Sequence, residues 1–165
     1  MKNVLILFVI LLTIACGSET KKYKLLSSEE LNDAELYFGI EDLKNAKDMD
    51  SVYVFLVKEE DLKSDSYLRD EIFKYRNIQD LSFRRLSLKE IKYSDLKKFP
   101  NLQNLDYANN NLIEITSEIK SLKNLKELNL EYNDISELPD ELHQLTKLEK
   151  LYIGYNPISS EELLK

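Results

Sequence analysis

Residues 102–158 contain one eleven-residue pattern three times, as LQNLDYANNNL at 102–112, LKELNLEYNDI at 125–135 and LEKLYIGYNPI at 148–158. Each copy begins 23 residues after the previous one. Apolar or aromatic residues stand at the first, fourth, sixth and eleventh places of every copy, and Asn stands at the ninth. A pattern of this length does not recur in register by chance, so each copy is interpreted as one turn of a repeating structure.

The second copy shows what one turn does. Leu128 and Leu130 alternate with polar residues at positions 127, 129 and 131, which is the period of two expected of a short strand with one buried face. Asn133 follows where the chain must turn. A buried amide at that point can bond backbone groups of the neighbouring turn that would otherwise stay unpaired.

One such turn, or coil, cannot bury its own apolar side, so successive coils must stack. Stacking places a parallel sheet on one face and irregular or short helical turns on the other. Two less regular coils precede the clear copies, with Glu60 and Leu86 at their Asn positions. The sequence therefore predicts five strands, near residues 52–57, 78–83, 102–107, 125–130 and 148–153.

The repeated pattern resembles L-x-x-L-x-L-x-x-N/C-x-L, the signature of leucine-rich repeats. The resemblance is to the bacterial leucine-rich repeat proteins, and it implies an α/β solenoid with a short, curved parallel β-sheet of about five strands and an N-terminal helical cap. It also implies a non-catalytic binding scaffold. A structural ladder of buried amides is expected from Asn110, Asn133 and Asn156.

The expected organisation has five parts. A signal peptide covers residues 1–15, a lipidated Cys and flexible tether 16–24, an N-terminal helical cap 25–51, the repeats 52–158, and a short C-terminal cap 159–165. Ser27-Ser28-Glu29-Glu30-Leu31 opens the predicted helical cap with a Ser at the N-cap position.

The first fifteen residues are typical of a secretory signal. Lys2 supplies one positive charge, and residues 4–12 form an unbroken apolar run that ends near Ala15. This run is too short for a spanning helix, which needs roughly 20 apolar residues. The single cysteine of the chain, Cys16, follows at once and has no intramolecular partner for a disulfide.

Leu12-Thr13-Ile14-Ala15-Cys16 resembles the lipobox of bacterial lipoproteins. That resemblance implies cleavage before Cys16, a diacylglycerol on its sulfur and, usually, an acyl chain such as palmitate on its amine. The expected location is therefore the bacterial cell envelope, with the protein anchored to a membrane through lipid. Gly17 in place of Asp allows the outer membrane by analogy with enterobacterial sorting. The alternative is a plain secretory signal with an incidental Cys.

Composition and motifs argue against several functions. The net charge of -7, with no Lys or Arg run longer than two residues, disfavours nucleic acid as a partner. Phosphate-binding, hydrolase and zinc motifs are absent from the sequence, as are EF-hand loops. The one histidine, His143, has no recognisable catalytic companions. We therefore expect no enzyme activity, no cofactor and no metal.

Alternation assigns the outward side chains of the sheet, and this concave face is the predicted site for a protein partner. Tyr and Arg are enriched at interface hot spots. The predicted partner-binding residues are Arg84, Arg85, Asp106, Asn109, Asn129, Tyr132, Tyr152 and Tyr155. Two alternatives stay open at this point: these residues only keep the face soluble, or the domain is a structural envelope protein that self-associates through its solenoid end. The sequence leaves the oligomeric state unknown.

Overall fold

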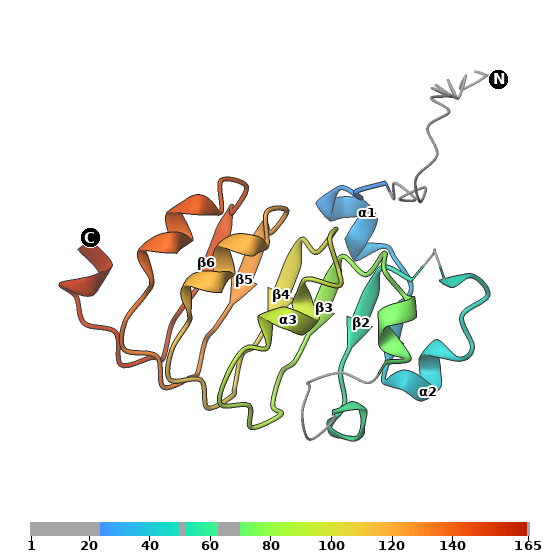
Figure 1. Ribbon diagram of the computed structural model, residues 1–165, viewed down its shortest axis with the longest axis horizontal. Helices are drawn as coiled ribbons and strands as arrows, with labels where there is room; N and C mark the ends of the chain where they lie inside the picture. Colours follow the sequence, from blue (N-terminus) through green and yellow to red (C-terminus); the bar gives the residue numbers. More distant parts are fainter. Residues whose placement is uncertain (1–23, 50–51, 63–69, 165) are drawn as a thin grey trace, which may run out of the picture.

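The computed structural model describes residues 24–49, 52–62 and 70–164. The predicted signal peptide, the lipidation site Cys16 and the tether up to residue 23 lie outside the described residues. In the described part the chain forms a row of coils, each with one strand, and the strands lie side by side along the molecule (Figure 1).

The sheet has six parallel strands in the order of the sequence. The strands are β1 (Leu36–Phe38), β2 (Val54–Leu56), β3 (Asp80–Ser82), β4 (Asn104–Asp106), β5 (Glu127–Asn129) and β6 (Lys150–Tyr152). Each is three residues long, because the chain turns away from the sheet soon after the inward residue at the strand centre. The predicted stack of coils is confirmed.

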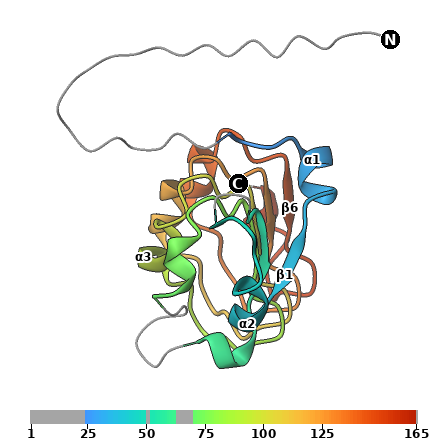
Figure 2. The same ribbon diagram turned by 90° about the vertical axis from the view of Figure 1, so that its right-hand side faces the viewer.

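Short helical turns complete the coils, and α3 lies on the opposite side of the coils from the strands, whereas α1 lies on the strand side (Figure 2). The α-helical turns are α1 (Ser28–Asn32), α2 (Ile40–Leu43) and α3 (Tyr93–Leu96), and the 3-10 turns are η2 (Glu59–Asp61), η3 (Ile72–Lys74), η4 (Ser117–Ser121), η5 (Asp140–Gln144) and η6 (Glu162–Leu164). In α1 the predicted Ser cap is present, with Ser27 Oγ accepting from Glu30 N–H at 3.1 Å. Both α1 and α2 come from the predicted cap region.

The N-terminal cap differs from the prediction, because it contains a sixth strand where only helix was expected. Strand β1 pairs with β2 in the same register as the later coils, with Tyr37 beside Phe55. Val54 follows Leu36 by only 18 residues, which is less than the repeat period of 23. Counting back from the clear repeats therefore does not locate β1. The short helix α2 follows β1 directly and contacts it.

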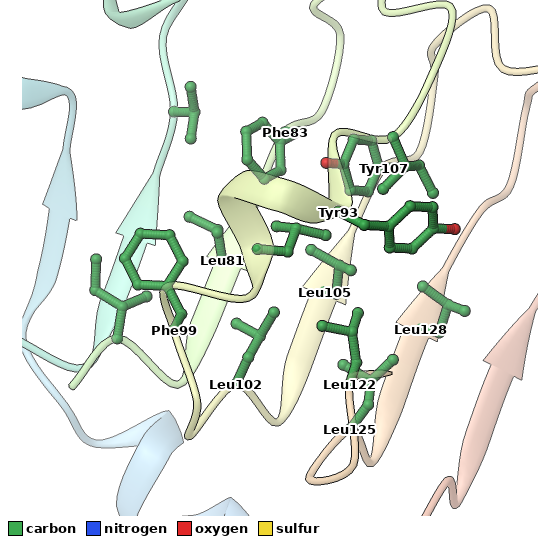
Figure 3. Packing of buried hydrophobic residues seen from close by; sticks show 14 of the residues in the cluster. Leu81, Phe83, Tyr93, Phe99, Leu102, Leu105, Tyr107, Leu122, Leu125 and Leu128 are labelled. Atoms are coloured by element: carbon green, nitrogen blue, oxygen red, sulfur yellow. The ribbon is translucent and has the colours of Figure 1, made fainter. Parts of the chain in front are cut away.

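One inward residue from the centre of each strand makes the apolar spine. The pairing places Tyr37, Phe55, Leu81, Leu105, Leu128 and Leu151 in one row. Figure 3 shows Leu81, Leu105 and Leu128 along this row, and all three are fully buried. Phe83 and Tyr107 continue the spine as a stacked pair with ring centroids 4.7 Å apart. Burying a side chain of this size contributes roughly 1.5–3 kcal/mol.

Buried amides join the coils behind the spine. Asn133 donates from Nδ2 to the carbonyls of Leu130 at 2.9 Å and Tyr107 at 3.0 Å, and its Oδ1 accepts from Leu112 N–H at 3.0 Å. Asn110 and Asn156 make the same set of bonds one coil earlier and one coil later. Each amide thus satisfies backbone groups of two coils at once.

The first coil uses a carboxylate for the same purpose. Asp61 is buried, and its two oxygens accept from Ile40 N–H and Lys58 N–H, each at 3.0 Å. It stands one place after Glu60, which simple counting had aligned with the Asn position. Asp61 therefore ties the cap to the coil that contains β2.

Replacing Asn133 with Ala is expected to lower the free energy of unfolding by about 2–4 kcal/mol, since it leaves buried carbonyls and one N–H without partners. The matched variant Asn156→Ala should lose less, because Asn156 is only half-buried and water can replace its amide. Urea unfolding followed by circular dichroism measures both. Equal losses in the two variants would show that burial does not set the value of these bonds.

Candidate functional site

The outward side chains of the six strands form two rows across the concave face. The first row is Leu36, Val54, Asp80, Asn104, Glu127 and Lys150, and the second is Phe38, Leu56, Ser82, Asp106, Asn129 and Tyr152. Read along the solenoid, both rows change from apolar on β1 and β2 to acidic or polar on β3 to β5. The last strand presents Lys150 and Tyr152.

The apolar end of the face was not predicted. Leu36 and Phe38 on β1 are 53% and 51% exposed, and Leu56 on β2 is half-buried beside them. Phe38 and Leu56, with Lys58 and Arg84, border a hollow of about 680 Å³ at the ends of β1 to β3. The signal that was overlooked is the triplet Leu36-Tyr37-Phe38 directly before Gly39, because a β-prone triplet next to glycine fits a strand better than a helix.

The two predicted arginines follow β3 and are both exposed. Arg84 Nη1 lies 3.4 Å from Asp106 Oδ2 on the next coil, so the structure brings these two predicted residues together. Arg85 has a backbone φ of 59° and forms no ion pair with any residue that the structure describes.

The middle of the face is acidic and partly closed to water. Burial raises the pKa of Asp80, while a hydrogen bond from Asn104 Nδ2 at 2.8 Å acts in the opposite direction. Burial also raises the pKa of Asp106. A raised pKa means that the folded state disfavours the carboxylate form. At neutral pH these two charges therefore reduce stability.

The last two coils carry an exposed tyrosine pair. Tyr132 and Tyr155 are stacked with ring centroids 4.1 Å apart and an interplanar angle of 8°. A hydrogen bond with the Tyr155 side chain raises the pKa of the Tyr132 phenol. Both residues have left-handed backbones, with φ of 56° and 57°, and Tyr155 is 72% exposed. Bulky residues seldom adopt this conformation, because it costs of order 1 kcal/mol or more.

Two other predicted residues use their side chains locally. Asp106 Oδ1 accepts from Ala108 N–H at 2.8 Å, and Asn129 Oδ1 accepts from Glu131 N–H at 3.1 Å. Such contacts two residues along the chain stabilise the turn that follows each strand. Asn109 is half-buried and occupies the left-handed position of its coil, with φ of 58°.

Six of the eight predicted residues fall into two groups. Arg84, Arg85 and Asp106 lie beside the apolar end, whereas Tyr132, Tyr152 and Tyr155 lie on the last two coils. Neighbouring strands are about 4.8 Å apart, so the three steps from β3 to β6 place Arg84 and Tyr155 roughly 14 Å apart. Asp106 and Tyr132 lie on successive coils, so the two groups meet in the middle of the face.

Within residues 24–49, 52–62 and 70–164, none of the helices has the length and apolar character that a membrane span requires. The same ranges contain no group of three or more His, Cys, Asp or Glu residues placed to hold a metal ion. His143 is exposed, and its Nδ1 contacts the Asp140 carbonyl at 2.9 Å.

Comparison with known proteins agrees with this geometry. Residues 100–158 match the family described as leucine rich repeat. A leucine-rich repeat protein of Leptospira interrogans has a similar structure, with a TM-score of 0.55 and 24% identity over 74% of this chain and 36% of that one. The fold is a leucine-rich repeat solenoid. Solenoids of this kind present extended concave surfaces for binding.

Internalin C2 from Listeria monocytogenes is also similar, with a TM-score of 0.50 and 21% identity over 74% of this chain and 50% of that one. The chain thus spans between about a third and a half of the length of these two proteins. No curated protein sequence matches the chain.

Replacing Asp80 with Asn is expected to stabilise the protein at pH 7.5 by roughly 1 kcal/mol, which corresponds to about 2–4 °C in Tm. The raised pKa of Asp80 means that its charge opposes folding above that pKa. The gain should therefore disappear as the pH falls below about 3.9, where the unfolded-state carboxyl is also protonated. Thermal unfolding at several pH values measures it. The exposed Asp134→Asn is the control, and an equal gain in both variants would contradict this explanation.

Proposed function

We propose that this leucine-rich repeat domain is a non-catalytic interaction module that holds a protein partner against its concave face. The single observation that carries the proposal is the stacked pair Tyr132 and Tyr155, with Tyr152 on the neighbouring strand. All three are exposed aromatic residues, and two of them occupy unfavourable left-handed positions.

The tyrosine cluster has a physical rationale as a binding surface. Stacking in the free protein holds the two rings in place, so little side-chain entropy is lost when a partner covers them. Tyr presents a large apolar face and a phenol that can donate or accept, which is why it is enriched at hot spots. The half-buried carboxylates of Asp80 and Asp106 also lower stability, and such unfavourable groups are typical of functional surfaces.

We further propose that lipid on Cys16 anchors the protein to a membrane of the bacterial cell envelope. This part of the proposal rests on the sequence of residues 1–16 alone. Two or three acyl chains would hold the protein stably, since each buried methylene contributes roughly 0.8 kcal/mol. The anchor would keep the concave face among envelope proteins.

Crosslinking in intact cells, followed by mass spectrometry, tests the binding face. The wild-type protein is expected to give an adduct with a second protein. The triple variant Tyr132→Asn, Tyr152→Ser and Tyr155→Asn should give at least tenfold less of this adduct. Asn tolerates the left-handed backbone, so relief of strain offsets loss of the stack, and stability should stay within about 1 kcal/mol. A variant that folds and crosslinks as well as the wild type would place the partner elsewhere.

Fractionation of cells tests the anchor. The wild-type protein should sediment with membranes and enter the detergent phase, whereas Cys16→Ala should not be lipidated and should lose both properties. Cys16→Ser is the isosteric control, because its hydroxyl does not accept the thioether-linked lipid. Membrane association of both variants at the wild-type level would contradict lipid anchoring.

A second candidate function is structural self-association through the last coil. There Leu148, Leu151 and Ile153 are only partly buried, and together with Leu163 they border a hollow of about 400 Å³. In the crosslinking experiment this function would give an adduct of two identical chains. That adduct would persist in the tyrosine variant and disappear in Leu163→Glu.

A further inference from the structure

The hollow at the apolar end of the concave face combines a hydrophobic floor with positive charge. Phe38 and Leu56 form the floor, and Lys58, Arg84 and Arg85 stand around it. Lys58 is held in place, since its Nζ lies 4.6 Å from the centroid of the Phe38 ring. Its stem passes over Gly39, where a Cβ would come within 2.8 Å of Lys58 Cδ. Lys58 thus covers part of the Phe38 ring, which is still 51% exposed.

The three cations that line the hollow differ in their ion pairs. Lys58 lies 3.8 Å from Glu60, and Arg84 lies 3.4 Å from Asp106. Arg85 has no such partner among the described residues, although it lines the same hollow. Its backbone is fixed by a hydrogen bond from Arg85 N–H to the Ala108 carbonyl at 3.2 Å, in the left-handed conformation. The site therefore offers an apolar floor next to Arg85, which forms no ion pair with a carboxylate of residues 24–49, 52–62 or 70–164.

We propose that this hollow binds a segment of the partner protein in which a large apolar side chain stands beside a carboxylate. The apolar side chain would cover Phe38 and Leu56, and the carboxylate would accept hydrogen bonds from the Arg85 guanidinium. The inference rests on the proposed function and specifies the chemistry of the partner at one end of the face.

The neighbouring charges favour a peptide over an extended anionic surface. Glu59 and Glu60 also line the hollow, and Asp80, Asp106 and Glu127 occupy the adjoining face. A polyanion or an anionic membrane would meet these carboxylates at once and be repelled. A segment with one or two carboxylates placed toward Arg85 avoids them. The arrangement thus selects a localised negative charge beside an apolar anchor.

Short synthetic peptides test this directly with the full-length protein. The probe carries Glu-Phe-Glu between flexible Gly and Ser ends, and fluorescence anisotropy measures its binding. It should bind with a Kd below about 1 mM. Matched peptides with Gln-Phe-Gln or Glu-Ala-Glu should bind at least tenfold more weakly, because each removes one of the two contacts.

Protein variants locate the binding. Phe38→Ser and Arg85→Asn should each weaken the Glu-Phe-Glu peptide at least tenfold, and Asn suits the left-handed backbone at position 85. Arg76→Asn is the charge control, because Arg76 is exposed but precedes β3, whereas Arg85 follows it. It should bind as the wild type does. Circular dichroism verifies that all three variants are folded.

Three results would overturn the inference: no binding of the Glu-Phe-Glu peptide at 1 mM, equal binding of the Gln-Phe-Gln peptide, or equal weakening by Arg76→Asn. Binding of phosphatidylglycerol vesicles that depends on Phe38 and Arg85, without peptide binding, would also overturn it. These failures leave the crosslinking result untouched, so they are distinguishable from failure of the proposed function.

Discussion

Each coil of this protein has one apolar flank that only its neighbours can cover. The inward residue at the centre of each strand meets its counterpart on the next coil, from Tyr37 through Leu105 to Leu151. Because side chains alternate along a strand, fixing this inward row also fixes which residues face out. The composition of the concave face is therefore a direct consequence of core packing.

The outward features of the concave face lower the free energy of unfolding. The apolar spine and the amide ladder provide the stability that offsets this loss. Asn110 and Asn133 satisfy carbonyls and N–H groups of successive coils deep in the structure. Against this background the fold accommodates two half-buried carboxylates and a stacked tyrosine pair with left-handed backbones. These unfavourable groups all lie on or beside the same face. Their common location is what connects the packing of the solenoid to the proposed binding function.

Much of the fold follows from the sequence, since the period of 23 and the alternation of Leu128 and Leu130 are local signals that packing reinforces. Strand β1 could not be found in the same way, because its spacing to β2 is shorter and its outward residues, Leu36 and Phe38, are apolar. Alternation is invisible in a strand that is apolar on both faces. Asp61 bridges two coils but stands one residue after the position that the repeat spacing aligns with Asn, so the spacing alone does not identify it.

The candidate site was predictable only in part. Alternation gave the outward residues. The hydrogen bonds that Asp106 and Asn129 accept from backbone N–H groups two residues later depend on local geometry. The stack of Tyr132 on Tyr155 requires knowing the left-handed conformation at both positions. The hollow beside Phe38 required the sixth strand. Contacts between coils decide these features, and a single coil does not reveal them.

The strand register is the foundation of this account, and engineered cysteine pairs test it most directly. In a Cys16→Ala background, Glu127→Cys with Lys150→Cys places two thiols on facing residues of β5 and β6, whose side chains already contact each other at 3.0 Å. Facing strands are about 4.8 Å apart, within the range for a disulfide. Mild oxidation should crosslink this pair rapidly and leave Glu127→Cys with Tyr152→Cys unlinked. Equal crosslinking of the two pairs, or crosslinking of the second pair alone, would contradict the register and the concave face derived from it.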